Sequence, residues 1–346
     1  MKHIVISDTH SPFFILKIYH HLRSNLLYKN VDAIVINGDL LGTFSISKSS
    51  KYKKSTLDNE EYLKHLQEGA PAFFSKIKGS FEITQELVED YVKERYNWCL
   101  SILIKFSKLR KTIFNCGNHE SEHQMLVLNE ISSLIGDFHV DIPKLKKYAR
   151  EFDRNLLELE KKADFHYLRH EPLVLNNTLI LGIPGESHDP FSKVQEKKTI
   201  ELLKKAKEKL INVNFLIIYN HTHGNYDRET GAFWCSSPSL DEFMNNLPSN
   251  IVRKIFVQSH NHWSYSKFIN YKNFSILMNN AGLHNGLYNL IDFTALRVEC
   301  KDLDSSRNTT LDLKQNNDFS PIKDELDLIK RFYNDPEYIL RRKQGY

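Results

Sequence analysis

The chain has 346 residues, 41% of them hydrophobic, which is enough to bury one large core or a core with an inserted lobe. Its 47 basic and 43 acidic residues nearly balance at a net charge of +4, so the overall charge indicates no polyanion-binding surface. The four cysteines form no CxxC pair, no apolar run approaches the roughly 18 residues of a membrane span, and a strand expected from residue 3 leaves no room for a signal peptide. These features predict a reduced, cytoplasmic protein with no membrane partner.

The first predicted strand ends in two polar side chains of a kind that binds metals. Ile4, Val5 and Ile6 favour a β-strand, and Asp8 and His10 follow it two positions apart. In α/β proteins functional side chains gather at the carboxyl ends of strands, because strands fix the backbone while loops leave side chains free to converge. A lone Asp-x-His pair is more often a surface turn, so its meaning depends on partners elsewhere in the chain.

A predicted βαβ unit follows. Residues 13–30 repeat apolar positions at helical spacing, which predicts the crossover helix to a second strand at 33–37. The next strand of this kind does not begin until Thr112. We expect the intervening residues 43–111, and a second helix-like stretch at 121–163, to be helical insertions that together form a cap beside the site.

Four later strands also end in Asp, Asn or His. The apolar runs 33–36, 112–116, 215–219 and 255–258 are followed by Asp39, by Asn118 and His119, by His221 and His223, and by His260 and His262. Because the carboxyl ends of parallel strands meet at one edge of a sheet, these side chains are expected to converge. A purely structural explanation does not account for five such strand ends.

From about residue 165 the sequence is again rich in β-favouring residues. We expect strands over 165–168, 173–183, 266–282 and 293–300, with a hairpin turn at Asn176-Asn177, and a charged amphipathic helix over 193–210. Residues 301–346 read as a linker followed by a C-terminal helix. Glu186, Ser187 and His188 lie near the expected edge of the site, where ordinary loop chemistry is favoured over substrate contact.

The polar residues at the strand ends suit divalent metal ions. Mn, Fe, Zn and Ni accept carboxylate oxygen, amide oxygen and imidazole nitrogen, and no cysteine is needed. Two ions about 3.5–4 Å apart share a bridging carboxylate and can clamp both oxygens of an in-line displacement at phosphorus. His223 is an alternative to His221, although the position directly after the strand favours His221. The candidate metal ligands are Asp8, His10, Asp39, Asn118, His221, His260 and His262, with Asp39 as the natural bridge.

The ordered motifs resemble the signature of the calcineurin-like metallophosphoesterase superfamily. That signature is D-x-H, G-D, G-N-H-[DE], H and G-H-x-H, and all five blocks occur in order between residues 8 and 262. The resemblance implies an α/β fold, a four-layer α-β-β-α sandwich of two mixed sheets, here with a helical cap insertion. The core would comprise residues 1–42, 112–120 and 164–300.

The resemblance also implies roles for the motif residues. His119 would be the second-sphere imidazole that stabilises or protonates the leaving oxygen, and Asp39 would be shared by both metals. One metal would be held by Asp8, His10, Asp39 and His262, and the other by Asp39, Asn118, His221 and His260.

Two positions depart from the family pattern. Gly42 stands where the family often has a second Asp that orients the catalytic imidazole, so His119 needs another partner, for which Glu120 and His123 are candidates. Ser259 replaces the usual glycine of the last block. Serine can serve there if the backbone does not need positive φ.

The resemblance implies a binuclear-metal-dependent phosphoesterase in which a metal-bridging hydroxide attacks phosphorus directly. Two divalent ions are expected, with Mn favoured and Fe, Zn, Ni or Mg as alternatives. We expect a phosphodiesterase acting on nucleic acid or nucleotides, so that DNA or RNA is a candidate partner. A phosphomonoesterase for small molecules or phosphoproteins is the alternative, although Gly42 weakens the protein-phosphatase version. An inactive metal-binding scaffold is disfavoured because all the ligands are present.

A nucleic-acid substrate would require a basic groove lined with aromatic side chains. The basic run at 48–54 is by itself more typical of a solvated loop. The candidate groove residues in the first insertion are Lys51, Tyr52, Lys53, Lys54, Arg95 and Trp98.

Overall fold

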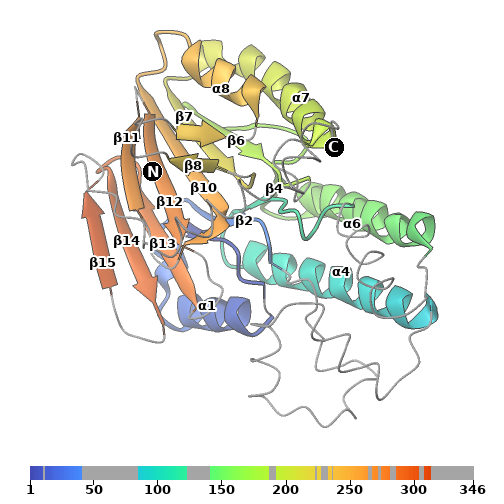
Figure 1. The fold of residues 1–346 in the computed structure, drawn as a ribbon. Helices are drawn as coiled ribbons and strands as arrows, with labels where there is room; N and C mark the ends of the chain where they lie inside the picture. The colour runs from blue at the N-terminus through green and yellow to red at the C-terminus, as the bar shows by residue number, and fades with distance from the viewer. Residues whose placement is uncertain are drawn as a thin grey trace.

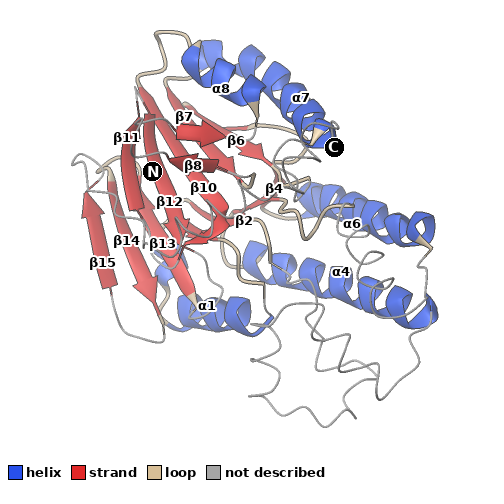
Figure 2. Cartoon of the chain, viewed as in Figure 1, coloured by secondary structure: helices blue, strands red, loops and turns tan. Residues whose placement is uncertain are grey.

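The structure is a computed structural model of the chain, drawn in Figure 1. It describes residues 1–10, 12–40, 85–122, 141–186, 192–222, 224–226, 233–235, 237–263, 267–271, 274–280, 286–303 and 308–312. Within these residues two mixed β-sheets stack face to face, and helices cover the outer face of each sheet (Figure 2).

The first sheet has seven strands in the order β15-β14-β13-β1-β2-β3-β4. β1, β2, β3 and β4 run parallel, and β13, β14 and β15 extend the sheet in antiparallel fashion. The strand bounds are β1 Lys2–Ile6, β2 Ala33–Asn37, β3 Thr112–Asn115, β4 Phe165–Tyr167, β13 Leu287–Asp292, β14 Arg297–Asp302 and β15 Asn308–Asp312.

The second sheet has six strands in the order β11-β12-β10-β7-β6-β5. β6, β7, β10 and β12 run parallel, while β5 and β11 pair antiparallel at the two edges. The strand bounds are β5 Leu173–Leu175, β6 Thr178–Ile183, β7 Phe215–Asn220, β10 Arg253–Trp263, β11 Lys267–Tyr271 and β12 Phe274–Asn280, and β8 Gly224–Tyr226 pairs with β9 Phe233–Cys235 in a separate ribbon.

Three apolar clusters account for the layers. Val5, Val35 and Ile217 belong to the cluster that fills the space between the two sheets. A second cluster joins the first sheet to α1 Pro12–Ser24, α4 Gln85–Ser107 and α6 Ile142–Lys162. A third joins the second sheet to α7 Lys193–Lys209 and α8 Pro238–Asn245. The expected α-β-β-α sandwich of two mixed sheets is therefore confirmed.

The described parts of the two predicted insertions are helices of the sandwich itself. Val92 and Phe106 of α4, and Phe152 and Leu156 of α6, are buried in the same cluster as Ile34 of β2. The two helices are thus the crossovers from β2 to β3 and from β3 to β4, which corrects their assignment to a cap. An amphipathic stripe shows that a helix buries one face, but not what covers that face. Residues 43–84 and 123–140 of the predicted insertions lie outside the described residues.

The end of the core differs from the expectation. Residues 293–296 form a turn rather than a strand, because Asp292 Oδ1 accepts hydrogen bonds from the backbone N–H groups of Thr294 and Ala295. β14 begins only at Arg297, and β15, within the predicted linker, pairs antiparallel with it. The core therefore extends to residue 312. The predicted C-terminal helix lies outside the described residues.

The predicted hairpin turn at Asn176-Asn177 is confirmed. Both residues have positive φ, 47° and 61°, as a two-residue turn of type I′ requires. Leu175 and Thr178 pair directly across the turn. Asparagine tolerates this backbone conformation better than most residues do, which explains the Asn-Asn sequence at this point.

His3 of β1 is a buried histidine that makes folding stability depend on pH. Its Nδ1 lies 2.7 Å from the hydroxyl of Tyr219 on the opposite sheet, and burial lowers its pKa to about 3. Because the unfolded chain then binds the proton more readily, the stabilising effect is complete above about pH 6.5 and is lost as the pH falls toward 3. Between pH 7.5 and pH 5 we expect His3 to cost about 2 kcal/mol of unfolding free energy.

Urea unfolding of the wild type and His3→Gln at the two pH values measures this cost. Glutamine does not titrate and can still hydrogen-bond to Tyr219, so the variant should lose less stability on acidification than the wild type. Equal losses in the two proteins would show that His3 is not the source of the pH dependence.

Candidate metal centre

The predicted ligands gather at the carboxyl ends of parallel strands from both sheets. Asp8 follows β1, Asp39 follows β2, Asn118 follows β3 and His221 follows β7, and each is at most 1% exposed. His260 lies within β10, after its regular pairing with β12 ends at Gln258. The two sheets therefore bring together residues that are far apart in the sequence.

Asp39 lies at the centre of this group. Its Oδ2 is 3.0 Å from His221 Nε2, 3.5 Å from His10 Nε2 and 4.0 Å from His119 Nε2. Potential ligand atoms lie within 4.8 Å of one another in two groups, one of His10, Asp39 and His119 and the other of Asp39, His221 and His260. Asp39 belongs to both groups, which is the position that a bridging carboxylate requires.

Two buried atoms of this centre suit metal ligands. Asp39 Oδ2 and His221 Nε2 are buried and 3.0 Å apart, and apart from this ion pair neither has a well-aligned hydrogen bond. Buried polar atoms are normally hydrogen-bonded, and a bound cation would satisfy both of these. On the other side of the ring, His221 Nδ1 donates to the backbone carbonyl of Asn37 at 2.6 Å. That bond leaves Nε2 available as the ligand atom.

The electrostatics of the centre favour positive charge. Burial alone would raise the pKa of Asp39, but the imidazoles of His221, His119 and His10 hold it well below its usual range. Burial alone would lower the pKa of His221, but the carboxylates of Asp39 and Asp8 raise it to about 10. An environment that stabilises a proton on His221 so strongly would also stabilise a metal cation in its place.

Several candidate ligands adopt an unusual backbone conformation. Asp8, His10, Asp39 and His260 all have positive φ, between 45° and 78°. Non-glycine residues adopt this region at a cost in free energy and concentrate there at functional sites. Backbone hydrogen bonds from Asp8 to Gly38 and from His10 to Asp39 hold the first two loops together.

Gly38 and Ser259 show how closely the loops approach. Gly38 has a φ of 79°, and a Cβ atom there would lie 2.2 Å from His221 Nδ1, so only glycine fits. Ser259 does not have positive φ, since His260 takes up the left-handed conformation instead. The condition for serine at this position is therefore met, and the Ser259 hydroxyl accepts a hydrogen bond from Asn37 Nδ2 at 2.7 Å.

The loop that carries Asn118 and His119 is held from within and from α4. Glu120 Oε2 accepts hydrogen bonds from the backbone N–H groups of Asp39 and Gly117, at 2.9 and 3.0 Å. The Arg95 guanidinium donates to the carbonyl oxygen of His119 at 2.8 Å. Of the two candidate partners of the His119 imidazole, Glu120 uses its Oε2 for these backbone bonds, and His123 lies outside the described residues.

Arg95 and Trp98 of α4 were candidates for nucleic-acid contact. Arg95 is only 4% exposed, so its side chain is not on the surface. Trp98 is half-buried and packs against the apolar cluster under the first sheet. The other candidates, Lys51, Tyr52, Lys53 and Lys54, lie outside the described residues.

Glu186 has a structural role, as loop chemistry predicted. Arg169 donates to both oxygens of its carboxylate, at 2.7 and 2.8 Å, and also to Asp153 at 2.8 Å. This ion cluster anchors the loop after β6, in which a Cβ atom at Gly185 would lie 2.7 Å from the backbone nitrogen of Asn118. Arg169 was not among the predicted site residues. The nearby Ser187 and His188 lie outside the described residues.

Two of the predicted site residues fall wholly or partly outside the described residues. His223 lies outside the described residues, so the choice between His221 and His223 rests on the position of His221 alone. His262 falls within the bounds of β10, but its side chain lies outside the described part of the structure. Among the described side chains, His10, Asp39, His221 and His260 lie together, and Asp8 Oδ1 is 3.8 Å from His221 Nε2.

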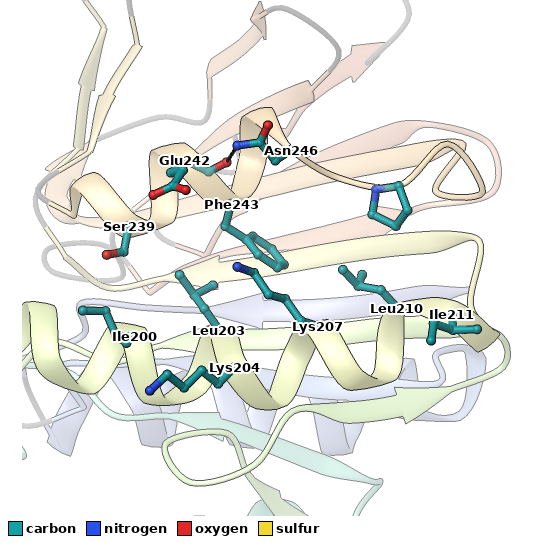
Figure 3. Close-up of a pocket in the computed structure, with 11 residues that line it drawn as sticks. Ile200, Leu203, Lys204, Lys207, Leu210, Ile211, Ser239, Glu242, Phe243 and Asn246 are labelled. Atoms are coloured by element: carbon teal, nitrogen blue, oxygen red, sulfur yellow. Dashed lines mark hydrogen bonds between the residues drawn. The ribbon is translucent and has the colours of Figure 1, made fainter.

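The second sheet carries a surface pocket on its helical side (Figure 3). It has a volume of about 350 Å³ between α7 and α8, with Phe243 and Leu203 in its wall and the side chains of Lys204 and Lys207 on α7. None of the metal-motif residues lines it. The pocket is thus separate from the candidate metal centre.

The chain matches no protein-family model and no curated relative. The structure is similar to solved structures at low identity. TT1561 of Thermus thermophilus is 11% identical, with a TM-score of 0.47 over 87% of this chain and 98% of that chain. A dimetal phosphatase from Danio rerio is 11% identical, with a TM-score of 0.39 over 90% and 99%. Yfce, a phosphoesterase from E. coli, is 12% identical, with a TM-score of 0.32 over 90% and 100%.

The fold and the site together define the class of protein. The chain is a four-layer α-β-β-α sandwich with a cluster of Asp and His side chains at the carboxyl ends of its strands. This arrangement agrees with the calcineurin-like metallophosphoesterase resemblance that the ordered motifs carry. No helix among the described residues is long and apolar enough to cross a membrane.

Proposed function

We propose that this protein is a binuclear-metal-dependent phosphoesterase. The observation that carries the proposal is the central position of Asp39, whose Oδ2 lies within 4.0 Å of imidazole nitrogens of His10, His119 and His221. His260 is grouped with Asp39 and His221, and Asp8 Oδ1 lies 3.8 Å from His221 Nε2. Asn118 and His262 complete the proposed set by the order of the motifs. When bound, two divalent cations would lower the pKa of water and neutralise charge on a phosphoryl group.

The chain's own residues would orient these ions and move a proton. Asp39 holds both sides of the centre together, and the carbonyl of Asn37 fixes the tautomer of His221. The His119 ring is 7% exposed and packs edge-on against His10, with 4.6 Å between the ring centroids. From this position His119 would protonate the leaving oxygen as a general acid.

We further propose phosphodiesters, including nucleic acids or nucleotides, as the substrate class. A phosphomonoester carries a second negative charge, which favours sites that offer a guanidinium to it. The two described arginines that adjoin the motif loops are engaged elsewhere, since Arg95 donates to the His119 carbonyl and Arg169 binds Glu186 and Asp153. This arrangement favours the single charge of a diester. Manganese is the proposed native ion, in a cytoplasmic enzyme.

Hydrolysis of bis-p-nitrophenyl phosphate and p-nitrophenyl phosphate in the presence of Mn²⁺ tests the proposal. We expect a higher kcat/KM for the diester, and loss of that activity on chelation of the metal. Preference for the monoester would overturn the substrate class but not the chemistry. Two bound metals without hydrolysis of either ester, or of DNA, RNA and cyclic nucleotides, would indicate the inactive scaffold instead.

A further inference from the structure

A set of buried side-chain amides connects the two sheets next to the candidate ligands. Asn37, Asn115 and Asn220 are each fully buried at or near the carboxyl ends of their strands. Asn115 Nδ2 donates to Asn37 Oδ1 at 2.8 Å, and Asn37 Nδ2 donates to the Ser259 hydroxyl at 2.7 Å. These bonds run from β3 to β2 within the first sheet and from β2 to β10 in the second.

Asn37 is the residue through which these bonds reach the ligands. It precedes Asp39 by two positions, and its backbone carbonyl accepts the bond from His221 Nδ1. Its side chain binds Ser259, the immediate neighbour of His260. One residue of the first sheet thus contacts one ligand of the second sheet and the neighbour of another.

Most of the remaining space between the sheets is filled by apolar side chains such as Val35, Ile217 and Val257. The polar contact between His3 and Tyr219 also joins the sheets, but it involves none of the candidate ligands. Apolar contacts are non-directional, whereas metal ligation tolerates errors of only about 0.2 Å. Hydrogen bonds have defined lengths and angles, so they can fix the ligand positions more closely than packing does.

A second pair of amides supports the same edge within the second sheet. Asn220 Nδ2 donates to Gln258 Oε1 at 2.7 Å, and Gln258 Nε2 donates to the carbonyl of Thr222 at 2.6 Å. Asn220 and Gln258 are the last residues of the regular pairing between β7 and β10. His221 and His260 lie just beyond this point, so amide bonds support the strands where the ladder ends.

We propose that Asn37 is a positioning residue that sets the distance between the ligands of the two sheets, Asp39 on one side and His221 and His260 on the other. Through this distance it would determine how tightly the second cation is held and how strongly the two cations interact. The inference rests on the proposed function only in requiring a metal pair at this site.

Manganese binding to the full chain tests this role without measuring activity. Equilibrium dialysis gives the number and affinity of bound Mn²⁺ ions, and electron paramagnetic resonance reports the exchange coupling of a Mn²⁺ pair. In the wild type we expect two ions with a coupled spectrum. In Asn37→Leu we expect weaker binding of the second ion by about 10–100-fold, the usual effect of removing a group that orients metal ligands, and a reduced coupled signal.

Three further variants guard against a general loss of structure. Ser259→Ala removes only the 2.7 Å bond to Asn37 and should weaken the coupled signal in the same direction even if Asn37→Leu does not fold. Ser259→Thr keeps the hydroxyl and should restore it. Asn250→Ala is the matched control. Asn250 lies in the loop that precedes β10, and its side chain donates to the backbone carbonyls of Leu210 and Val213, which precede β7. This variant should lower stability and leave the spectrum unchanged.

The outcomes separate the two proposals. A coupled Mn²⁺ pair in the wild type that is unchanged in folded Asn37→Leu and in Ser259→Ala would overturn the role of Asn37 and leave the proposed function intact. A wild type that binds no Mn²⁺, and none of Fe²⁺, Zn²⁺, Ni²⁺ or Mg²⁺, would overturn both. A change of the same size in Asn250→Ala would assign the effect to stability and would also overturn the positioning role.

Discussion

Asp39→Asn is expected to remove both metal binding and activity. Asp39 Oδ2 is the atom closest to the imidazoles on both sides of the centre, and an amide cannot bridge two cations as a carboxylate does. Lewis-acid stabilisation by metals contributes several kcal/mol, so we expect kcat/KM to fall by about 10³-fold or more. The number of bound Mn²⁺ ions should fall from two to one or none, as measured by equilibrium dialysis.

The control for this variant is Asp164→Asn. Asp164 is paired with Lys111 on the surface, with its side chain 56% exposed, and such pairs contribute little to stability. It should bind two ions and retain activity. If Asp39→Asn kept two ions and wild-type kcat/KM, Asp39 would not be the bridge, and the proposed centre would have to be assigned to other residues.

His119→Ala is expected to separate chemistry from metal binding. A well-placed general acid contributes about 10²–10⁴ to the rate, so kcat should fall by this factor while two ions remain bound. The size of the loss should depend on the leaving group. Esters with a poor leaving group, such as an alkyl alcohol, need protonation more than p-nitrophenyl esters do, and should lose more activity.

The geometry also allows a second role for His119, that of a metal ligand. Its Nε2 lies 4.0 Å from Asp39 Oδ2, and it is grouped with His10 and Asp39 as a potential ligand. If His119→Ala lost one metal ion, His119 would be a ligand rather than the general acid. Equal losses for good and poor leaving groups, with both ions retained, would also argue against proton transfer by this imidazole.

Two side chains outside the candidate ligand set hold the loop around His119 in place. Arg95 from α4 holds its carbonyl, and the Glu120 carboxylate holds the backbone of Asp39 and Gly117. Buried hydrogen bonds of this kind make a local structure more rigid. Helix α4, which was expected to form part of a cap, therefore stabilises this loop through Arg95.

Much of the fold and the site could be predicted from local sequence. The strand at 33–37 and the hairpin turn at Asn176-Asn177 followed from runs of β-favouring residues and from turn chemistry. Both depend on neighbouring residues only, so the sequence contains the information directly. The candidate ligands were found in the same way, because each motif lies directly after an apolar run.

Only the tertiary structure decided which surfaces meet. The amphipathic stripe of α4 indicated one buried face, but its position on the first sheet, and the burial of Arg95 with it, depend on packing between distant segments. β15 was not predicted from the sequence, because this segment is a strand mainly through its pairing with β14.

The amide connections at the site show the same limit most clearly. Asn37 donates a hydrogen bond to Ser259, which is 222 positions away in the sequence. Asn115 donates one to the carbonyl of Tyr219, which is 104 positions away. The sequence by itself determined that polar side chains follow the buried strands, since periodicity and order along the chain are local properties. It could not determine which of them bond to one another, because a hydrogen bond depends on the distance and angle that the packing of two sheets creates.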